Sequence, residues 1–262
     1  MKKIITWGLS ISIFMSMNVP ILAASSNVQA REVQHEIIED FDALCEEYNQ
    51  NEDMAMEELL LLHPSLEIVD SSKTYFDDAG DVIIPTRSDM TDISLIGDKL
   101  VYDSDWDTYI YFGYWEWKQS PDERNLNPFD VVGFYTQNAE EMAPLEYFVS
   151  GYNALGNRIA YYNTDSDETS GCIIKGEDTE WGAAFWIDDR YVREGRMSVP
   201  IDYTSGSRAK VMLKYSHSWT TTNITGVGGS ISIDGAGFDI SWETSVNHWE
   251  SPVTSSGVRL PK

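Results

Sequence analysis

Residues 102–117 read YDSDWDTYIYFGYWEW, in which three carboxylates at alternate positions lead into a run of aromatic side chains. Aromatic and β-branched residues in alternation are typical of β-strands, where successive side chains point to opposite faces. If the stretch is one extended strand, its even positions form an apolar face suited to a core, namely Trp106, Ile110, Phe112 and Tyr114. The stretch therefore predicts a strand with one buried face in a mainly β protein.

The chain after Pro64 continues this period of two, with turn residues about every ten positions. RAKVMLKYSHSW at 208–219 alternates apolar and polar side chains, which indicates a half-buried antiparallel strand. SISIDGAGFDISW at 230–242 has Asp234 and Gly235 between two alternating arms, which is a strong β-hairpin pattern. Many strands joined by short turns predict a jelly-roll-like antiparallel β-sandwich.

The segment before Pro64 has the period of a helix instead. Between residues 32 and 48 apolar side chains recur at spacings of three and four, which predicts an amphipathic helix. A second helix is predicted to begin after Asn51, a good capping residue, and to end before Pro64. The prediction is therefore an N-terminal α-helical hairpin at 31–66, followed by the β-sandwich domain at 67–262.

Residues 1–30 have the three-part pattern of a secretory signal peptide. Two lysines precede an apolar run from Ile4 to Leu22, and small residues follow, so cleavage after Ala24 or after Ala30 fits equally well. We expect a secreted protein that is extracellular or loosely associated with the envelope. We also expect no stable membrane anchor after signal cleavage.

The chain is strongly acidic, with 43 Asp and Glu against 18 Lys and Arg and a formal net charge of −25. A field of this sign repels phosphate backbones, which argues against a nucleic-acid partner. The same field favours solubility and the binding of cations.

Cys45 and Cys172 are the two cysteines of the chain. In an exported protein they can form a disulfide, which would join the helical segment to the β region and stabilise the fold by about 4–5 kcal/mol through loop closure. The alternative is that both stay unpaired and buried as small hydrophobic side chains. The sequence leaves both outcomes open.

Three features of the β region resemble uncharacterised secreted proteins of Gram-positive bacteria. They are the aromatic strands with Trp-Glu-Trp at 115–117, YSHSW at 215–219, and the Ser/Thr/Gly-rich hairpin that follows. The resemblance supports the expectation of export. It implies no activity, cofactor or site residue.

The odd positions of the opening stretch form the candidate ligand-binding face. Carboxylates beside flat rings suit a carbohydrate, because its hydroxyl groups need charged acceptors and its C–H faces stack on rings. Gly113 would leave a gap through which a ligand approaches the backbone. The alternative is that Gly113 is a bulge and the tryptophans turn into the core. The predicted ligand-binding residues are Tyr109, Tyr111, Trp115 and Trp117.

The acidic part of the same stretch suggests a calcium site. DSDWDT places Asp103, Asp105 and Asp107 at the first three ligand positions of an EF-hand-like loop. An EF-hand is excluded, because Thr108 stands where glycine is required and Tyr114 where a bidentate glutamate is required. The pattern leaves a looser calcium site on the three aspartates, with a solvated acidic turn as the alternative.

These features favour a secreted, non-catalytic binding protein with an extracellular polysaccharide or cell-wall glycan as its ligand. The alternative is a glycoside hydrolase with paired carboxylates, in which Glu116 between Trp115 and Trp117 is a candidate general acid, because desolvation raises a carboxyl pKa. A third function is that of a pore-forming or antibacterial toxin, in which the hairpin from Gly226 to Glu243 inserts into a membrane. Its expected arms of about seven residues are short of the roughly nine to eleven that span a bilayer.

Overall fold

The chain is mainly β, with helices before the strands and two large antiparallel sheets, which confirms the predicted fold class. It divides into two compact units, Met1–Leu59 and Leu60–Lys262. Residues 1–27, which include most of the predicted signal peptide, lie outside the described residues. The computed structural model describes residues 28–76, 82–83, 94–117, 129–137, 142–144, 146–163, 168–170, 174–179, 182–188, 191–203, 210–218, 224–232, 235–242, 248–250 and 258–259.

The helical segment forms two helices, at residues 28–47 and at Glu52–Leu62 (α2). Asn51 caps α2 as predicted, because its Oδ1 accepts a backbone N–H of the first turn at 3.1 Å. Asn49 and Gln50 have φ values of 53° and 66°, the left-handed conformation that commonly ends a helix. None of the helices in the described part of the chain is long and apolar enough to cross a membrane.

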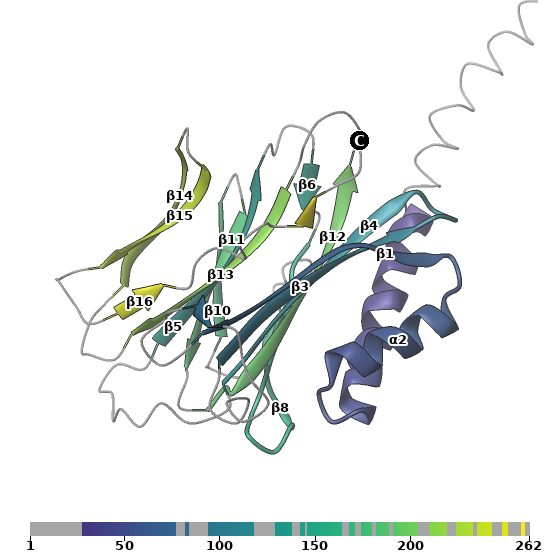
Figure 1. Ribbon diagram of the computed structural model, residues 1–262, viewed down its shortest axis with the longest axis horizontal. Helices are drawn as coiled ribbons and strands as arrows, with labels where there is room; N and C mark the ends of the chain where they lie inside the picture. Colours follow the sequence, from purple (N-terminus) through teal and green to yellow (C-terminus); the bar gives the residue numbers. More distant parts are fainter. Residues whose placement is uncertain are drawn as a thin grey trace, which may run out of the picture. The chain divides into compact units, whose positions relative to one another are not determined.

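The larger sheet has nine strands, and every described pair in it is antiparallel. Two central strands, β4 and β12, come from distant parts of the sequence and lie side by side (Figure 1). The order is β2 (Val82–Ile83), β1 (Leu66–Phe76), β3 (Ser94–Asp103), β4 (Thr108–Glu116), β12 (Glu194–Tyr203), β7 (Phe148–Tyr152), β8 (Arg158–Asn163) and β9 (Glu168–Ser170), with β6 (Met142–Pro144) also paired to β12.

The second sheet has six strands. Its strand from the segment 208–219 is buried on the predicted face, at Val211, Leu213 and Tyr215. The order is β10 (Ile174–Thr179), β11 (Gly182–Asp188), β5 (Phe129–Gln137), β13 (Lys210–Ser218) and β16 (His248–Glu250), with β17 (Val258–Arg259) also paired to β13.

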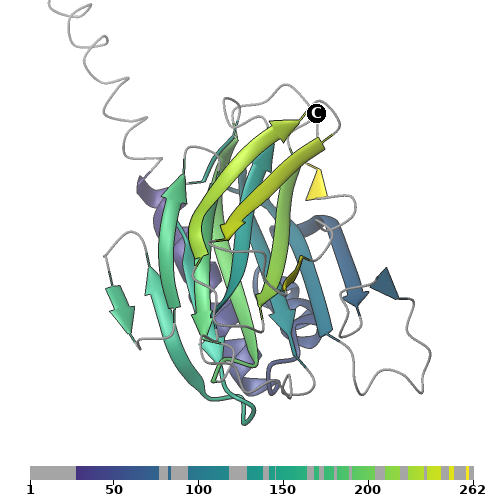
Figure 2. The same ribbon diagram turned by 90° about the vertical axis from the view of Figure 1, so that its left-hand side faces the viewer.

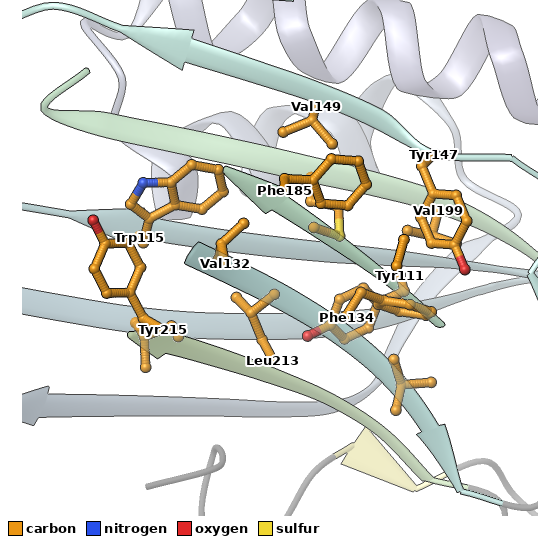
Figure 3. Packing of buried hydrophobic residues seen from close by; sticks show 14 of the residues in the cluster. Tyr111, Trp115, Val132, Phe134, Tyr147, Val149, Phe185, Val199, Leu213 and Tyr215 are labelled. Carbon is orange, nitrogen blue, oxygen red and sulfur yellow. The ribbon is translucent and has the colours of Figure 1, made fainter. Parts of the chain in front are cut away.

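The two sheets face each other around one hydrophobic core, which makes this unit a β-sandwich (Figure 3). Alternate residues of the central strands enter the core, as the pleat of a strand requires. Rings from the two sheets meet edge to face there, and the centroids of Tyr111 and Phe134 are 5.2 Å apart. Strand β12 supplies Met197, Val199 and Ile201, and strand β5 supplies Val132 and Phe134.

The predicted C-terminal hairpin is present as β14 (Ile224–Ser232) and β15 (Gly235–Trp242). Among the described strands these two pair with each other and with no third strand. Strand β15 lies against β5, and Figure 2 shows the hairpin in front of the second sheet. Asp234 of the predicted turn lies outside the described residues.

Candidate functional site

The stretch at 102–117 forms two strands and a turn, so the condition of one extended strand, on which its two faces were assigned, is not met. Strand β3 ends at Asp103, residues 104–107 turn, and β4 runs back beside β3. Asp107 has a φ of 54°, a left-handed conformation that aspartate tolerates better than most residues. Asp103 therefore ends one strand, Asp105 and Asp107 belong to the turn, and most of the aromatic residues belong to the next strand.

The four predicted ligand-binding side chains lie inside the sandwich. The pairing of β4 with β3 and with β12 runs without a shift through Gly113, so Gly113 is not a bulge. The four side chains share one face, as the unbroken register requires, but this face meets the second sheet. The expectation of an exposed aromatic face at these positions is therefore wrong, since the exposed fractions are 8% for Tyr109, 0% for Tyr111, 2% for Trp115 and 8% for Trp117.

A buried carboxylate lies beside Gly113 in the core. Asp98 pairs with Gly113 in the sheet and has no exposed surface. It accepts hydrogen bonds from the Tyr111 hydroxyl at 3.0 Å and from the N–H and hydroxyl of Ser72 at 3.1 and 2.5 Å. Burial first, and then the charge of Asp98, raise the pKa of Tyr111 well above its usual 10.0. These bonds give Asp98 a structural role.

A second buried carboxylate takes part in a link between the two sheets. Asp130 of β5 accepts a hydrogen bond from the Tyr215 hydroxyl of β13. The same hydroxyl oxygen accepts the Nε1–H of Trp117, just after β4, at 2.8 Å. The rings of Trp117 and Tyr215 meet edge to face, with centroids 5.7 Å apart. Trp117 therefore has both its ring and its polar atom engaged within the sandwich.

Glu116 does not share a strand face with the tryptophans on either side of it. Adjacent residues of a strand point to opposite faces, so Trp115, which enters the core, points away from Glu116. Glu116 is half-buried near the end of β4, where it pairs with Leu95 and Glu194. The expectation that its neighbouring tryptophans desolvate this carboxyl is therefore wrong.

The predicted calcium site is not formed by the three aspartates. Asp103 is 2% exposed, and its Oδ1 accepts the backbone N–H of Asp105 at 3.0 Å. Asp107 is exposed, and its Oδ1 accepts the Tyr102 hydroxyl at 2.9 Å. In the part of the chain that the structure describes, no group of three or more His, Cys, Asp or Glu side chains is placed to hold a metal ion. The aspartates instead shape the turn.

The exposed residues of the opening stretch lie in the turn between β3 and β4. Trp106 is half-exposed in this turn, Asp105 and Asp107 are exposed there, and Tyr102 is half-exposed near the end of β3. We call these four residues the turn site. The sequence reasoning missed Tyr102 and Trp106 as candidates, although the clustered Asp and Ser residues around them are a turn signal.

The turn site is held by contacts to the residue before β1 and to the core. The N–H and the hydroxyl of Ser104 both donate to the Ser65 carbonyl at 3.0 Å. The Tyr102 ring packs against the core, 4.9 Å from the Tyr109 ring. The hydrogen bond to Asp107 is the main cause that raises the pKa of Tyr102, with desolvation second. The turn is therefore fixed by backbone and side-chain contacts.

The Cys45–Cys172 disulfide stays a prediction. Cys45 has no exposed surface and lies on the first helix. It shares a helix face with Ile37, Phe41 and Leu44, which are also buried. Cys172 lies outside the described residues.

No protein-family model and no curated protein matches this chain. Among solved structures, it is similar to one described as a "Pore forming protein", at 8% identity and a TM-score of 0.34, over 71% of this chain and 94% of that chain. It is also similar to Clostridium perfringens delta-toxin, at 8% identity and a TM-score of 0.33, over 71% of this chain and 92% of that chain. Likenesses at these values assign no activity to this chain.

Proposed function

We propose that the protein is a secreted, non-catalytic binding protein, with an extracellular glycan as its ligand and the turn site as its binding element. The observation that carries the proposal is that half-exposed Trp106 and exposed Asp105 and Asp107 lie on one short turn, with half-exposed Tyr102 at the end of the strand before it. Sugar hydroxyls donate to carboxylates, and sugar C–H faces stack on aromatic rings. The turn site offers both kinds of contact.

The turn site is suited to binding because its backbone is fixed before a ligand arrives. Ser104 joins it to Ser65, and Asp103 accepts a backbone N–H from within the turn. A ligand that binds a fixed turn does not have to offset the entropy of ordering it. The net charge of −25 favours a neutral sugar over an acidic one.

The setting of the buried aspartates supports a non-catalytic role. Asp98 and Asp130 have no exposed surface and accept hydrogen bonds from Tyr111 and Tyr215 inside the sandwich. A glycoside hydrolase needs two carboxylates that face one sugar, about 5–9 Å apart. These two aspartates face the core instead, where they stabilise the packing of the sheets.

Replacing Trp106 with alanine is expected to weaken glycan binding by about tenfold or more, because a tryptophan at the centre of a contact contributes strongly to affinity. The melting midpoint of the protein is first measured against a panel of neutral polysaccharides and cell-wall fragments, since a ligand of the folded state raises it. Titration calorimetry with the best binder then compares the variant with the wild type.

Tyr161→Ala is the matched control, because Tyr161 is a half-exposed aromatic residue of β8, outside the turn site. It is expected to bind as the wild type does. The proposal fails if no glycan moves the midpoint, or if both variants lose affinity equally. Release of reducing sugar from any member of the panel would contradict the non-catalytic assignment.

A second candidate function is membrane insertion by the β14–β15 hairpin. The observation that favours it is that these strands form a sheet of their own among the described strands. The arms have nine and eight residues, longer than the sequence suggested and near the roughly nine to eleven of a transmembrane strand. The register pairs Val227 with Ile240 and Gly229 with Phe238. Apolar residues thus alternate with small or polar ones along the ribbon.

Ile240→Arg is expected to abolish dye release from phosphatidylcholine vesicles, because an arginine facing lipid costs about 2–4 kcal/mol at the middle of a bilayer. Ser241→Arg is the matched control, because the neighbouring position belongs to the opposite face of the ribbon. It is expected to retain dye release. Membrane insertion is excluded if the wild type releases no dye, or if both variants release it as the wild type does.

A further inference from the structure

We propose that one end of the sandwich docks on a phospholipid bilayer through Leu155 and Tyr191. These side chains are 84% and 53% exposed, and they lie on the turn between β7 and β8 and on the loop before β12. We call residues 153–158 and 191–193 of these two loops the docking end. The inference goes beyond glycan binding and does not rest on it.

Leu155 is held at the tip of a fixed turn. The Asn153 side chain accepts the backbone N–H of Leu155 at 2.9 Å and that of Asn157 at 3.1 Å. Backbone bonds join Asn153 N to Asn157 O at 3.0 Å and Gly156 N to Asn153 O at 2.9 Å. Gly156 has a φ of 73°, which glycine adopts without a steric cost. The turn therefore presents Leu155 to solvent and keeps it there.

Tyr191 lies on the adjoining loop. Its backbone N–H donates to the Asp188 carbonyl at 3.1 Å, and the next residue, Val192, is buried in the core. The N–H of Arg193 donates to the Tyr152 carbonyl at 2.7 Å, which joins this loop to the strand that leads into the turn. Figure 1 shows the turn before β8 projecting past its neighbouring strands. Both apolar side chains thus belong to one end of the sandwich.

The charged residues of the docking end, Arg158 and Arg193, are both basic, and Asp188, which ends β11, is 4% exposed. The turn segment NALGNR carries one charge, that of exposed Arg158, whose guanidinium lies 5.5 Å from the Tyr161 ring. Arg193 is half-exposed on the adjoining loop. Glu116 of β4 and Glu194 of β12 are paired residues of the larger sheet, and both are half-buried. These two arginines are therefore suited to lipid phosphate groups.

A bilayer fits this end better than a protein partner does. A stable protein interface buries about 800 Å² on each partner, which is more than two side chains on narrow loops can supply. A bilayer needs no complementary shape, because leucine can enter the acyl boundary while tyrosine and arginine stay at headgroup level. With so small an apolar surface, we expect the association to be weak and reversible.

The test is co-sedimentation of the full chain with sucrose-loaded phosphatidylcholine vesicles. The wild type is expected to partition onto the vesicles, and Leu155→Asn is expected to lower the partition coefficient by about fivefold or more. The variant should melt as the wild type does, because Leu155 has little contact to lose. Ile68→Asn is the matched control, since Ile68 is an exposed apolar residue, at 40%, on β1. It is expected to partition as the wild type does.

The hairpin and turn-site variants separate this inference from the two candidate functions. Ile240→Arg, which should not insert, and Trp106→Ala, which should not bind glycan, are both expected to keep the wild-type partition. The inference is overturned if the wild type stays in the supernatant. It is also overturned if Leu155→Asn partitions like the wild type, or if Ile68→Asn lowers the partition equally.

Discussion

Replacing Trp115 with alanine is expected to lower the free energy of unfolding by about 3–5 kcal/mol, the usual cost of deleting a large buried aromatic side chain. The Trp115 side chain is 2% exposed and lies between the sheets. Its ring lies over Gly195 of the next strand, and its centroid is 6.5 Å from that of Tyr215 in the opposite sheet. Alanine would leave a cavity that closely packed sheets cannot close. Denaturant unfolding measures the change.

Trp106→Ala makes the matched comparison, because the same substitution is made at a half-exposed position. Its expected effect on the unfolding free energy is below about 1 kcal/mol. The two variants should therefore separate stability from binding: Trp115→Ala loses stability and Trp106→Ala loses glycan affinity. If Trp115→Ala instead kept near-native stability and lost glycan binding, the binding face would lie on β4 and not at the turn site.

Gly195→Ala is expected to destabilise the protein by about 3 kcal/mol through overpacking. A Cβ at this position would stand 2.0 Å from Cζ2 and 2.4 Å from Cη2 of Trp115. Gly195 does not have a left-handed φ, so the expected cost is steric. It pairs with Trp115 on one side and Gly151 on the other, which leaves the backbone little room to move. Either the indole ring or the strand must shift.

Gly113→Ala provides the control, because a Cβ there would be 3.1 Å from the Cδ2 of Leu213 and from the Cε1 of Tyr111. The end of a leucine side chain can move by a few tenths of an ångström, so a smaller loss, below about 1.5 kcal/mol, is expected. Equal losses for the two variants would show that Trp115 does not pack on Gly195.

The fold class could be predicted from the sequence because its signals are local. The alternation of apolar and polar residues predicted β13 and the C-terminal hairpin, and Asn51 predicted the start of α2. Alternation did not show which face of β4 is covered, because both faces are apolar. Tyr111 and Phe112, which point to opposite faces, are 0% and 2% exposed. A strand buried on both faces resembles a strand with an aromatic binding face when it is seen as sequence alone.

The candidate site was harder to predict, because the distance between two residues along the sequence did not indicate whether they are close in the structure. In one extended strand, Asp103 and Asp107 would point to the same face. In the structure, Asp103 ends β3 and Asp107 ends the turn that follows it. The hydrogen bond between Tyr215 and Asp130 joins residues 85 positions apart in the sequence. No local sequence pattern predicts such a contact. The turn site itself had a local signal, since Asp and Ser residues that alternate with other residues are also turn formers.

The burial of the β4 aromatic residues is tested most directly by hydroxyl-radical footprinting of the folded protein, with oxidation at each tryptophan measured by mass spectrometry. Half-exposed Trp106 is expected to be oxidised several times faster than Trp115 and Trp117, which are 2% and 8% exposed. The unfolded chain, in which all three are accessible, supplies the reference rates. Oxidation of Trp115 and Trp117 in the folded protein as fast as that of Trp106 would contradict their place in the core.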